Sequence, residues 1–134
     1  MEEILGRIEE LQFSSNFDLI VGIGNGGIVP AYLMHSYLRL PLEFIWINFR
    51  DEKHKPRAPK PILTKPLNFD AKNKNILLVD DRSNSGATIA LAKKVLNDAK
   101  RISTFVVNGK ADYFLFNEKC FTMPWECARQ PTNE

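Results

Sequence analysis

Two stretches of the chain have the same order of apolar strand, polar turn and helix, and this order constrains the fold more than any other feature. In the first stretch, the apolar run 18–23 ends in glycines, and residues 28–40 are typical of a helix with Pro30 in its first turn. In the second stretch, residues 75–79 are expected to form a strand and residues 87–99 a helix.

A further strand is expected after each of these helices, at residues 42–49 and 102–107. Each strand completes a βαβ unit, and two such units predict an α/β fold with a doubly wound parallel sheet flanked by helices. Residues 2–13 are expected to add an N-terminal amphipathic helix. Its apolar positions are Ile4, Leu5, Ile8 and Leu11.

Length and composition limit the classes of protein that remain. The 134 residues suit one domain, 1–134, because a domain typically has ~150 residues. Hydrophobic residues make up 44% and charged residues 25%, and no run approaches the ~18 apolar residues of a membrane span. The net charge of +2 is too small to predict a nucleic-acid partner. The N-terminus is acidic and has no secretory signal, and the two cysteines, Cys120 and Cys127, form no disulfide framework. We therefore expect a cytoplasmic protein with no membrane partner.

Residues 50–66 separate the two βαβ units and are strongly basic. They contain six basic residues against two acidic ones, and four of the eight prolines. Since proline removes backbone donors and blocks helices, this segment is expected to be an extended, mobile basic loop. The alternative is a solvated linker.

The first polar turn has glycines at the spacing G-x-G-x-x-G, through Gly22, Gly24 and Gly27. This spacing allows a dinucleotide-binding turn or glycines that only make the turn tight. A dinucleotide site needs an acidic residue at the end of the next strand, whereas the candidate Glu43 stands at that strand's beginning. The turn does offer backbone N–H groups at a helix start, which suit an anionic group.

The second polar turn begins with two adjacent carboxylates, Asp80 and Asp81, and continues with small polar residues. The carboxylates can accept hydrogen bonds from a cis-diol or hold a Mg²⁺–polyphosphate. The hydroxyl and N–H groups of 83–88 can bind a terminal phosphate, and Gly86 lets the backbone come close. A diol and a phosphate a few ångströms apart describe a ribose 5-phosphate. The alternative is an Asp pair that ends a strand beside an ordinary helix cap.

Residues 78–88, Leu-Val-Asp-Asp-Arg-Ser-Asn-Ser-Gly-Ala-Thr, resemble the phosphoribosyl pyrophosphate (PRPP) signature of type I phosphoribosyltransferases. Residues 21–38 are similar to the pyrophosphate loop and next helix of the xanthine-guanine and hypoxanthine members, and 50–66 to their flexible catalytic loop. Residues 108–126, with the N-terminal helix, are similar to their hood. The resemblance implies a Mg²⁺-dependent reaction in which a base nitrogen displaces pyrophosphate from C1 of PRPP.

The resemblance also implies roles for individual residues. Asp80 and Asp81 would bind the ribose hydroxyls and Mg²⁺, and together with Asn84 they are the candidate catalytic residues. The pyrophosphate loop is expected to have a strained peptide near Gly24 and Asn25. The candidate PRPP-binding residues are Gly24, Asn25, Gly26, Gly27, Asp80, Asp81, Ser83, Asn84, Ser85, Gly86, Ala87 and Thr88. The candidate base-binding residues are Asn108, Lys110, Cys120 and Phe121.

Four positions depart from the family's pattern. Asn84 stands where purine enzymes usually carry an aspartate that faces N7 of the base, and a neutral amide cannot accept a proton in the same way. Asn25 stands where the pyrophosphate loop often has Arg or Lys. Cys120 falls where an aromatic residue is expected to stack on the purine, and Lys110 is a substitute for a lysine expected near Asn108.

The sequence thus predicts a Mg²⁺-dependent phosphoribosyltransferase that binds PRPP and a purine or purine-like base. A homodimer is expected because family members are commonly dimeric. The alternative from a different class is a regulatory protein that binds PRPP or a nucleotide without turnover, which Asn25, Asn84 and Cys120 favour. The acidic pair and the long basic loop favour the enzyme. An oxidoreductase would rest on the glycine spacing alone.

Overall fold

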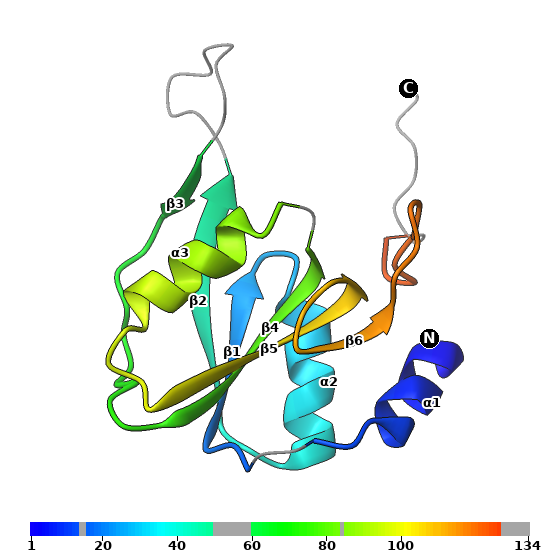
Figure 1. Cartoon of the computed structure of the whole chain (residues 1–134), viewed down its shortest axis with the longest axis horizontal. Helices are drawn as coiled ribbons and strands as arrows, with labels where there is room; N and C mark the ends of the chain where they lie inside the picture. Colours follow the sequence, from blue (N-terminus) through cyan, green and yellow to red (C-terminus); the bar gives the residue numbers. More distant parts are fainter. Residues whose placement is uncertain (14–15, 50–59, 84, 127–134) are drawn as a thin grey trace.

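A computed structural model of the chain describes residues 1–13, 16–49, 60–83 and 85–126. Six strands form one sheet in the order β3-β2-β1-β4-β5-β6, which confirms the α/β fold class (Figure 1). The elements are α1 (Glu2–Glu10), β1 (Leu19–Gly24), α2 (Ile28–Leu38), β2 (Leu42–Phe49), β3 (Pro61–Leu63), β4 (Asn75–Ser83), α3 (Ala87–Val95), β5 (Arg101–Gly109) and β6 (Tyr113–Phe116). None of the helices in these described ranges is long and apolar enough to cross a membrane.

The order of the strands locates the place where a ligand is expected. Strand β1 pairs in parallel with both β2 and β4, so the chain builds the sheet outward in two directions from the β1–β4 pair. In open α/β sheets, ligands bind at the carboxyl ends of the strands where the order reverses in this way. Both polar turns follow these two central strands, so they meet at this switch point (Figure 1).

Both faces of the sheet are covered, because successive residues of a strand point to opposite sides. Ile20 and Leu77 face a cluster that includes α1 and α2, whereas Val21 and Leu78 face a cluster that includes Ala92 of α3. All six residues of β1 are buried. This two-sided burial explains why the strand is an almost continuous apolar run.

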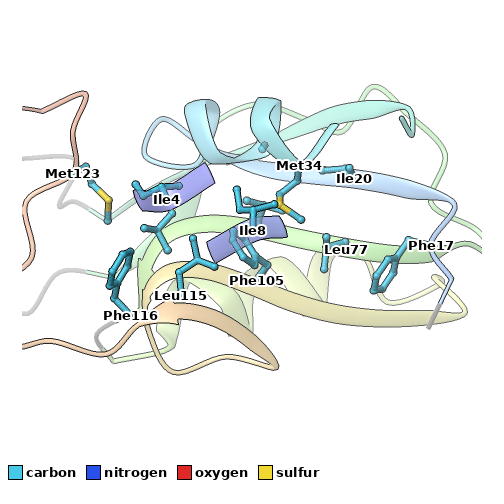
Figure 2. Close-up of a cluster of buried hydrophobic side chains, with 13 residues drawn as sticks. Ile4, Ile8, Phe17, Ile20, Met34, Leu77, Phe105, Leu115, Phe116 and Met123 are labelled. Atoms are coloured by element: carbon cyan, nitrogen blue, oxygen red, sulfur yellow. The ribbon is translucent and has the colours of Figure 1, made fainter. Parts of the chain in front are cut away.

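The N-terminal helix α1 packs beside β6 at the edge of the sheet. Figure 2 shows Ile4 and Ile8 pointing into the cluster that contains Phe105 and Leu115. The Arg7 side chain strengthens this contact, since Nη1 donates a hydrogen bond to the Leu115 carbonyl oxygen at 2.6 Å. The helix therefore packs against β6 and the segment that follows it.

The element boundaries differ from the predicted ones in a regular way. The helices end early: α2 stops at Leu38, where Arg39 adopts a left-handed conformation (φ 57°) ahead of Pro41. Strands β4 and β5 extend beyond the predicted Val79 and Val107, to Ser83 and Gly109. Strand β6 lies in the predicted hood.

The basic segment 50–66 is partly a strand. Residues 61–63, which the sequence analysis assigned to the loop, form β3 and pair antiparallel with β2. Proline is tolerated there because β3 is an edge strand and Pro61 is its first residue. Residues 50–59, which make up most of the predicted mobile loop, lie outside the described residues.

Candidate active site

The acidic pair lies at the polar end of β4. Asp80 is 8% exposed and Asp81 is half-buried. The Asp81 backbone N–H donates to Asp80 Oδ1 at 2.8 Å, and the Arg82 backbone N–H donates to Asp81 Oδ1 at 2.7 Å. Burial, together with the charge of Asp81, raises the pKa of Asp80 to about 8. Without a bound cation, Asp80 is therefore largely protonated at neutral pH.

A cavity of about 220 Å³ joins the acidic pair to the start of α3. Gly86 caps this helix with a left-handed backbone (φ 82°), a conformation that glycine adopts without steric cost. The Ser85 hydroxyl accepts a hydrogen bond from the Ala87 N–H at 3.2 Å. The lining residues are Asp80, Asp81, Arg82, Ser83, Ser85, Gly86, Ala87, Thr88 and Ile89. The cavity thus has carboxylates at one end and a helix N-terminus, which favours anions, at the other.

The glycine turn after β1 lies against the same acidic pair. A Cβ atom on Gly26 would stand 2.8 Å from the Asp81 carboxyl group, and one on Gly27 would stand 2.6 Å from the Ile23 and Val79 carbonyl oxygens. The peptide bond between Gly24 and Asn25 is cis, at the position where the family resemblance implied an unusual peptide. The close approach of these neighbours explains why Gly26 and Gly27 carry no side chain.

A second, larger cavity of about 570 Å³ lies beside the first, between the ends of β4 and β5 and the segment after β6. Its lining residues are Arg82, Ser83, Asn108, Gly109, Asn117, Glu118, Lys119, Cys120, Phe121 and Thr122. Arg82 and Ser83 line both cavities, so the two are adjacent. This arrangement suits a ligand with a sugar phosphate in one cavity and a base in the other.

Two side chains that line the larger cavity form hydrogen bonds with the segment after β6. The Asn108 side chain donates from Nδ2 to the Glu118 carbonyl oxygen and accepts from the Glu118 N–H, both at 2.9 Å. The Arg82 guanidinium donates to both carboxylate oxygens of Glu126. The hydrogen bond with Glu126 raises the pKa of Arg82 above its ordinary value.

The structure brings most of the predicted site residues together. The acidic pair and residues 85–88 line the smaller cavity, the glycine turn abuts Asp81, and three of the four predicted base-binding residues line the larger cavity. The exception is Lys110, which is exposed in the turn after β5 and is absent from that lining. Asn84 lies outside the described residues.

Arg82 and Glu126 are not among the site residues predicted from the sequence. The available signal was a cation directly after two acidic residues, in a strand that otherwise ends in small polar residues. Residues 117–119 and Thr122 were also missed as parts of the cavity wall. Their side chains share no pattern that marks a site.

The donor set at β4 fits a magnesium ion. Among the residues that the structure describes, no three His, Cys, Asp or Glu side chains form a metal-binding group. Mg²⁺, however, usually takes only one or two carboxylates and completes its coordination with water and substrate phosphates. Asp80 and Asp81, beside an anion-binding helix start, match that requirement.

Comparison with known proteins identifies the family. The family model described as phosphoribosyl transferase domain matches residues 1–129. The chain therefore belongs to the phosphoribosyl transferase family, and we assign it to the pentosyltransferase enzymes with the base unspecified. No curated protein matches the sequence.

Solved structures agree with this assignment. A purine phosphoribosyltransferase from Pyrococcus horikoshii Ot3 is similar to this chain with a TM-score of 0.79 and 28% sequence identity, over 99% of this chain and 91% of that one. A hypoxanthine-guanine phosphoribosyltransferase from Bacillus anthracis has a TM-score of 0.70 and 16% identity, over 90% and 82%. A hypothetical protein from Neisseria gonorrhoeae with bound ppGpp has a TM-score of 0.68 and 20% identity, over 86% and 75%. The last two similarities concern the fold alone.

Proposed function

We propose that the protein transfers the 5-phosphoribosyl group of PRPP to a purine or purine-like base and releases pyrophosphate. The observation that carries this proposal is one cavity that combines the buried Asp80, its neighbour Asp81 and the start of α3. A diol and a 5-phosphate need those two kinds of group a few ångströms apart. The adjoining larger cavity and the 28% identical purine enzyme support the choice of base.

The residues act on PRPP mainly by positioning it. The carboxylates of Asp80 and Asp81 accept hydrogen bonds from the ribose hydroxyls, while N–H and hydroxyl groups of 85–88 hold the 5-phosphate. The glycine turn offers backbone N–H groups to the pyrophosphate. With the sugar fixed at both ends, C1 is held between the leaving pyrophosphate and the base, which lowers the barrier through orientation.

Magnesium would be held by Asp80 and Asp81. When bound, it neutralises charge on the pyrophosphate leaving group. Since a metal ligand is the ionised carboxylate, binding of the ion would favour loss of the proton that burial keeps on Asp80.

The base would occupy the larger cavity, where Phe121 and Cys120 form part of the wall. The Phe121 ring packs on Phe116 with 4.5 Å between ring centroids, so its position is fixed by the core. Since the Asn108 amide already bonds to Glu118, the hydrogen-bonding edge of the base is left to backbone groups and to the side chains of 117–122.

The test is release of pyrophosphate from PRPP and Mg²⁺ with a panel of bases, including hypoxanthine, guanine, xanthine and adenine. Turnover with one or more purines supports the proposal, and the variants Asp80→Asn and Asp81→Asn should lower it. Each should also weaken PRPP binding, since a charge-assisted hydrogen bond contributes ~1.5 to 3 kcal/mol. Asp98→Asn, an exposed carboxylate after α3, is the matched control.

A binding protein without turnover is the second candidate, because Asn25 lacks the cation that the family's pyrophosphate loop often carries. PRPP binding in calorimetry, with no pyrophosphate released for any base, would favour it. Loss of both binding and turnover would contradict both candidates.

We also propose a cytoplasmic homodimer that takes part in nucleotide salvage. The dimer is supported by exposed apolar side chains one turn apart on α2, Ile28 (38% exposed) and Tyr32 (59% exposed). Light scattering at micromolar concentration tests it, and a monomer mass would contradict it.

A further inference from the structure

Arg82 connects the acidic end of β4 to the end of the described chain. Its guanidinium forms two hydrogen bonds with Glu126, from Nη1 to Oε2 at 3.1 Å and from Nη2 to Oε1 at 3.2 Å. Nη2 also donates to the Phe121 carbonyl oxygen at 3.1 Å. One side chain thus holds two points of the segment 121–126. The fork of a guanidinium suits this task, whereas the ammonium of a lysine does not.

Arg82 has a partner in this task on the next strand. Arg82 and Asn108 are register partners in the parallel β4–β5 pair. Asn108 binds the chain just before that segment, through both backbone polar groups of Glu118. Two neighbouring side chains near the carboxyl ends of β4 and β5 therefore attach the segment 118–126 at residues 118, 121 and 126.

Glu126 also bonds to Met123, whose side chain belongs to the core. Its Oε1 accepts a hydrogen bond from the Met123 N–H at 3.1 Å, and its own N–H donates to the Met123 carbonyl oxygen at 2.9 Å. The Met123 side chain is fully buried and lies near Phe116 in the cluster of Figure 2. The turn 123–126 is therefore fixed on one side by the core and on the other by Arg82.

The attached segment is the wall of the larger cavity. Residues 117–122 line it on one side, and Arg82 with Ser83 lines it on the other. The Arg82 and Glu126 side chains are 32% and 39% exposed, so their ion pair contributes little to global stability. Its contact is local, because it joins the end of β4 to the wall.

We propose that Arg82 is a positioning residue that fixes, through Glu126 and Phe121, the width of the cavity for the base. This inference rests on the proposed function of that cavity. The Arg82 Nη1 atom also lies 3.6 Å from Asp81 Oδ2, so the wall is held from the strand that binds the sugar. A displaced wall should weaken contacts with the base, while the sugar phosphate keeps its own ligands.

The experiment compares a sugar phosphate without a base with nucleotides that carry one. Calorimetry gives the dissociation constants of ribose 5-phosphate and of inosine, guanosine, xanthosine and adenosine 5′-monophosphates. The dissociation constant of ribose 5-phosphate divided by that of the tightest-binding nucleotide measures the contribution of the base to binding. We expect Arg82→Met to lower this ratio about tenfold, since small misplacements are costly in a preorganised site, and to change the ribose 5-phosphate constant less than about threefold.

Further variants separate positioning from direct contact. Glu126→Gln leaves Arg82 in place and removes the charge that orients it, so it should lower the ratio in the same direction. Arg82→Lys keeps the charge and loses the fork, so it should restore only part of the ratio. Lys94→Met, on the exposed side of α3, is the control and should leave both constants unchanged.

Four outcomes would overturn the proposal. An unchanged ratio in Arg82→Met removes the role, and so does a native protein that binds no nucleotide more tightly than ribose 5-phosphate. Equal weakening of both ligands would assign Arg82 to the sugar phosphate. A loss in Arg82→Met without any loss in Glu126→Gln would show that Arg82 does not act through Glu126. Pyrophosphate release by the native protein is measured separately. If the native protein releases no pyrophosphate but Arg82→Met still lowers the ratio, the proposed enzyme activity is contradicted and the role of Arg82 is not.

Discussion

The backbone of Gly26 lies directly against the carboxyl group of Asp81, with no room for a side chain between them. A Cβ atom at Gly26 would stand 2.8 Å from the carboxyl carbon and from both carboxylate oxygens of Asp81. This contact joins the turn after β1 to the end of β4 at the switch point of the sheet. The proposed pyrophosphate and ribose sites are therefore in contact, and each limits the geometry of the other.

The first prediction concerns this contact. Gly26→Ala should displace the Asp81 carboxylate, because a contact under 3 Å forces the more flexible group to move. Stability should change little, since Gly26 has no positive φ and the displaced group is the end of a side chain. PRPP binding in the presence of Mg²⁺ should weaken about tenfold or more.

Gly6→Ala is the matched control for that variant, because a Cβ atom at Gly6 in α1 would meet nothing within 4 Å. It should raise the free energy of unfolding by ~0.5 to 1 kcal/mol and leave PRPP binding unchanged. Calorimetry and urea denaturation measure the two properties. Equal PRPP affinities in the Gly26→Ala and native proteins would show that the contact has no functional role.

The second prediction concerns pH and the buried Asp80. Its pKa is raised to about 8, mainly by burial, whereas the ordinary value in the unfolded chain is 3.8. The native state therefore keeps a proton that the unfolded chain releases, so the free energy of unfolding should fall as the pH rises from about 4 to about 8. Asp80→Asn has no charge to bury, and the fall should be shallower in this variant.

Urea denaturation at pH 5 and pH 8, with a chelator present, tests this difference. At each pH, the free energy of unfolding of the native protein is subtracted from that of Asp80→Asn. This difference should be larger at pH 8 than at pH 5, in favour of the variant, by roughly 1 to 3 kcal/mol. Asp98→Asn, whose carboxylate is exposed, should show no such change. The same stability difference at both pH values would contradict a raised pKa at Asp80.

The third prediction concerns Asn108, whose amide bonds to both backbone groups of Glu118. Asn108→Asp replaces the donor with a carboxylate oxygen facing the Glu118 carbonyl. Because the side chain is buried, the free energy of unfolding should fall by ~1 to 3 kcal/mol. Asn117→Asp makes the same change at an exposed neighbouring position and should be nearly neutral. Similar losses in both variants would show that Asn108 does not hold the segment.

Apolar patterning was enough to predict the centre of this fold. The continuous burial of β1 and the periodicity of α3 are visible in the sequence because each apolar position packs against one of two covered faces. The same pattern could not show where β4 and β5 end. Arg82 and Asn108 belong to the sheet through backbone pairing alone, which leaves no trace in side-chain character.

The parts of the candidate site that are contiguous in the chain could also be predicted, but the contacts between distant residues could not. The acidic pair and the helix start are consecutive in the chain, so their chemistry could be inferred together. The attachment of Glu126 to Arg82 joins residues 44 positions apart in the sequence. Local patterns carry no information about such a contact, and β3 was missed because its three residues lie in a segment rich in proline and lysine.

The last prediction concerns Asn84, which stands where purine enzymes of the family usually carry an aspartate. If the protein is a purine transferase with an altered base site, Asn84→Asp should raise turnover with hypoxanthine or guanine. General base assistance of this kind typically contributes ~10² to 10⁴-fold. The added charge precedes a helix start, where acidic residues are favoured, so the free energy of unfolding should change little.

Initial rates of the native and Asn84→Asp proteins at saturating PRPP decide the question, and Asn73→Asp, an exposed position before β4, is the control for added charge. If the natural ligand is another base, or if the protein binds PRPP without turnover, the new carboxylate has no N7 proton to accept. It should then repel the incoming phosphate. Purine turnover would stay at background while PRPP affinity is unchanged or lower, and this combination would favour the binding protein over the purine transferase.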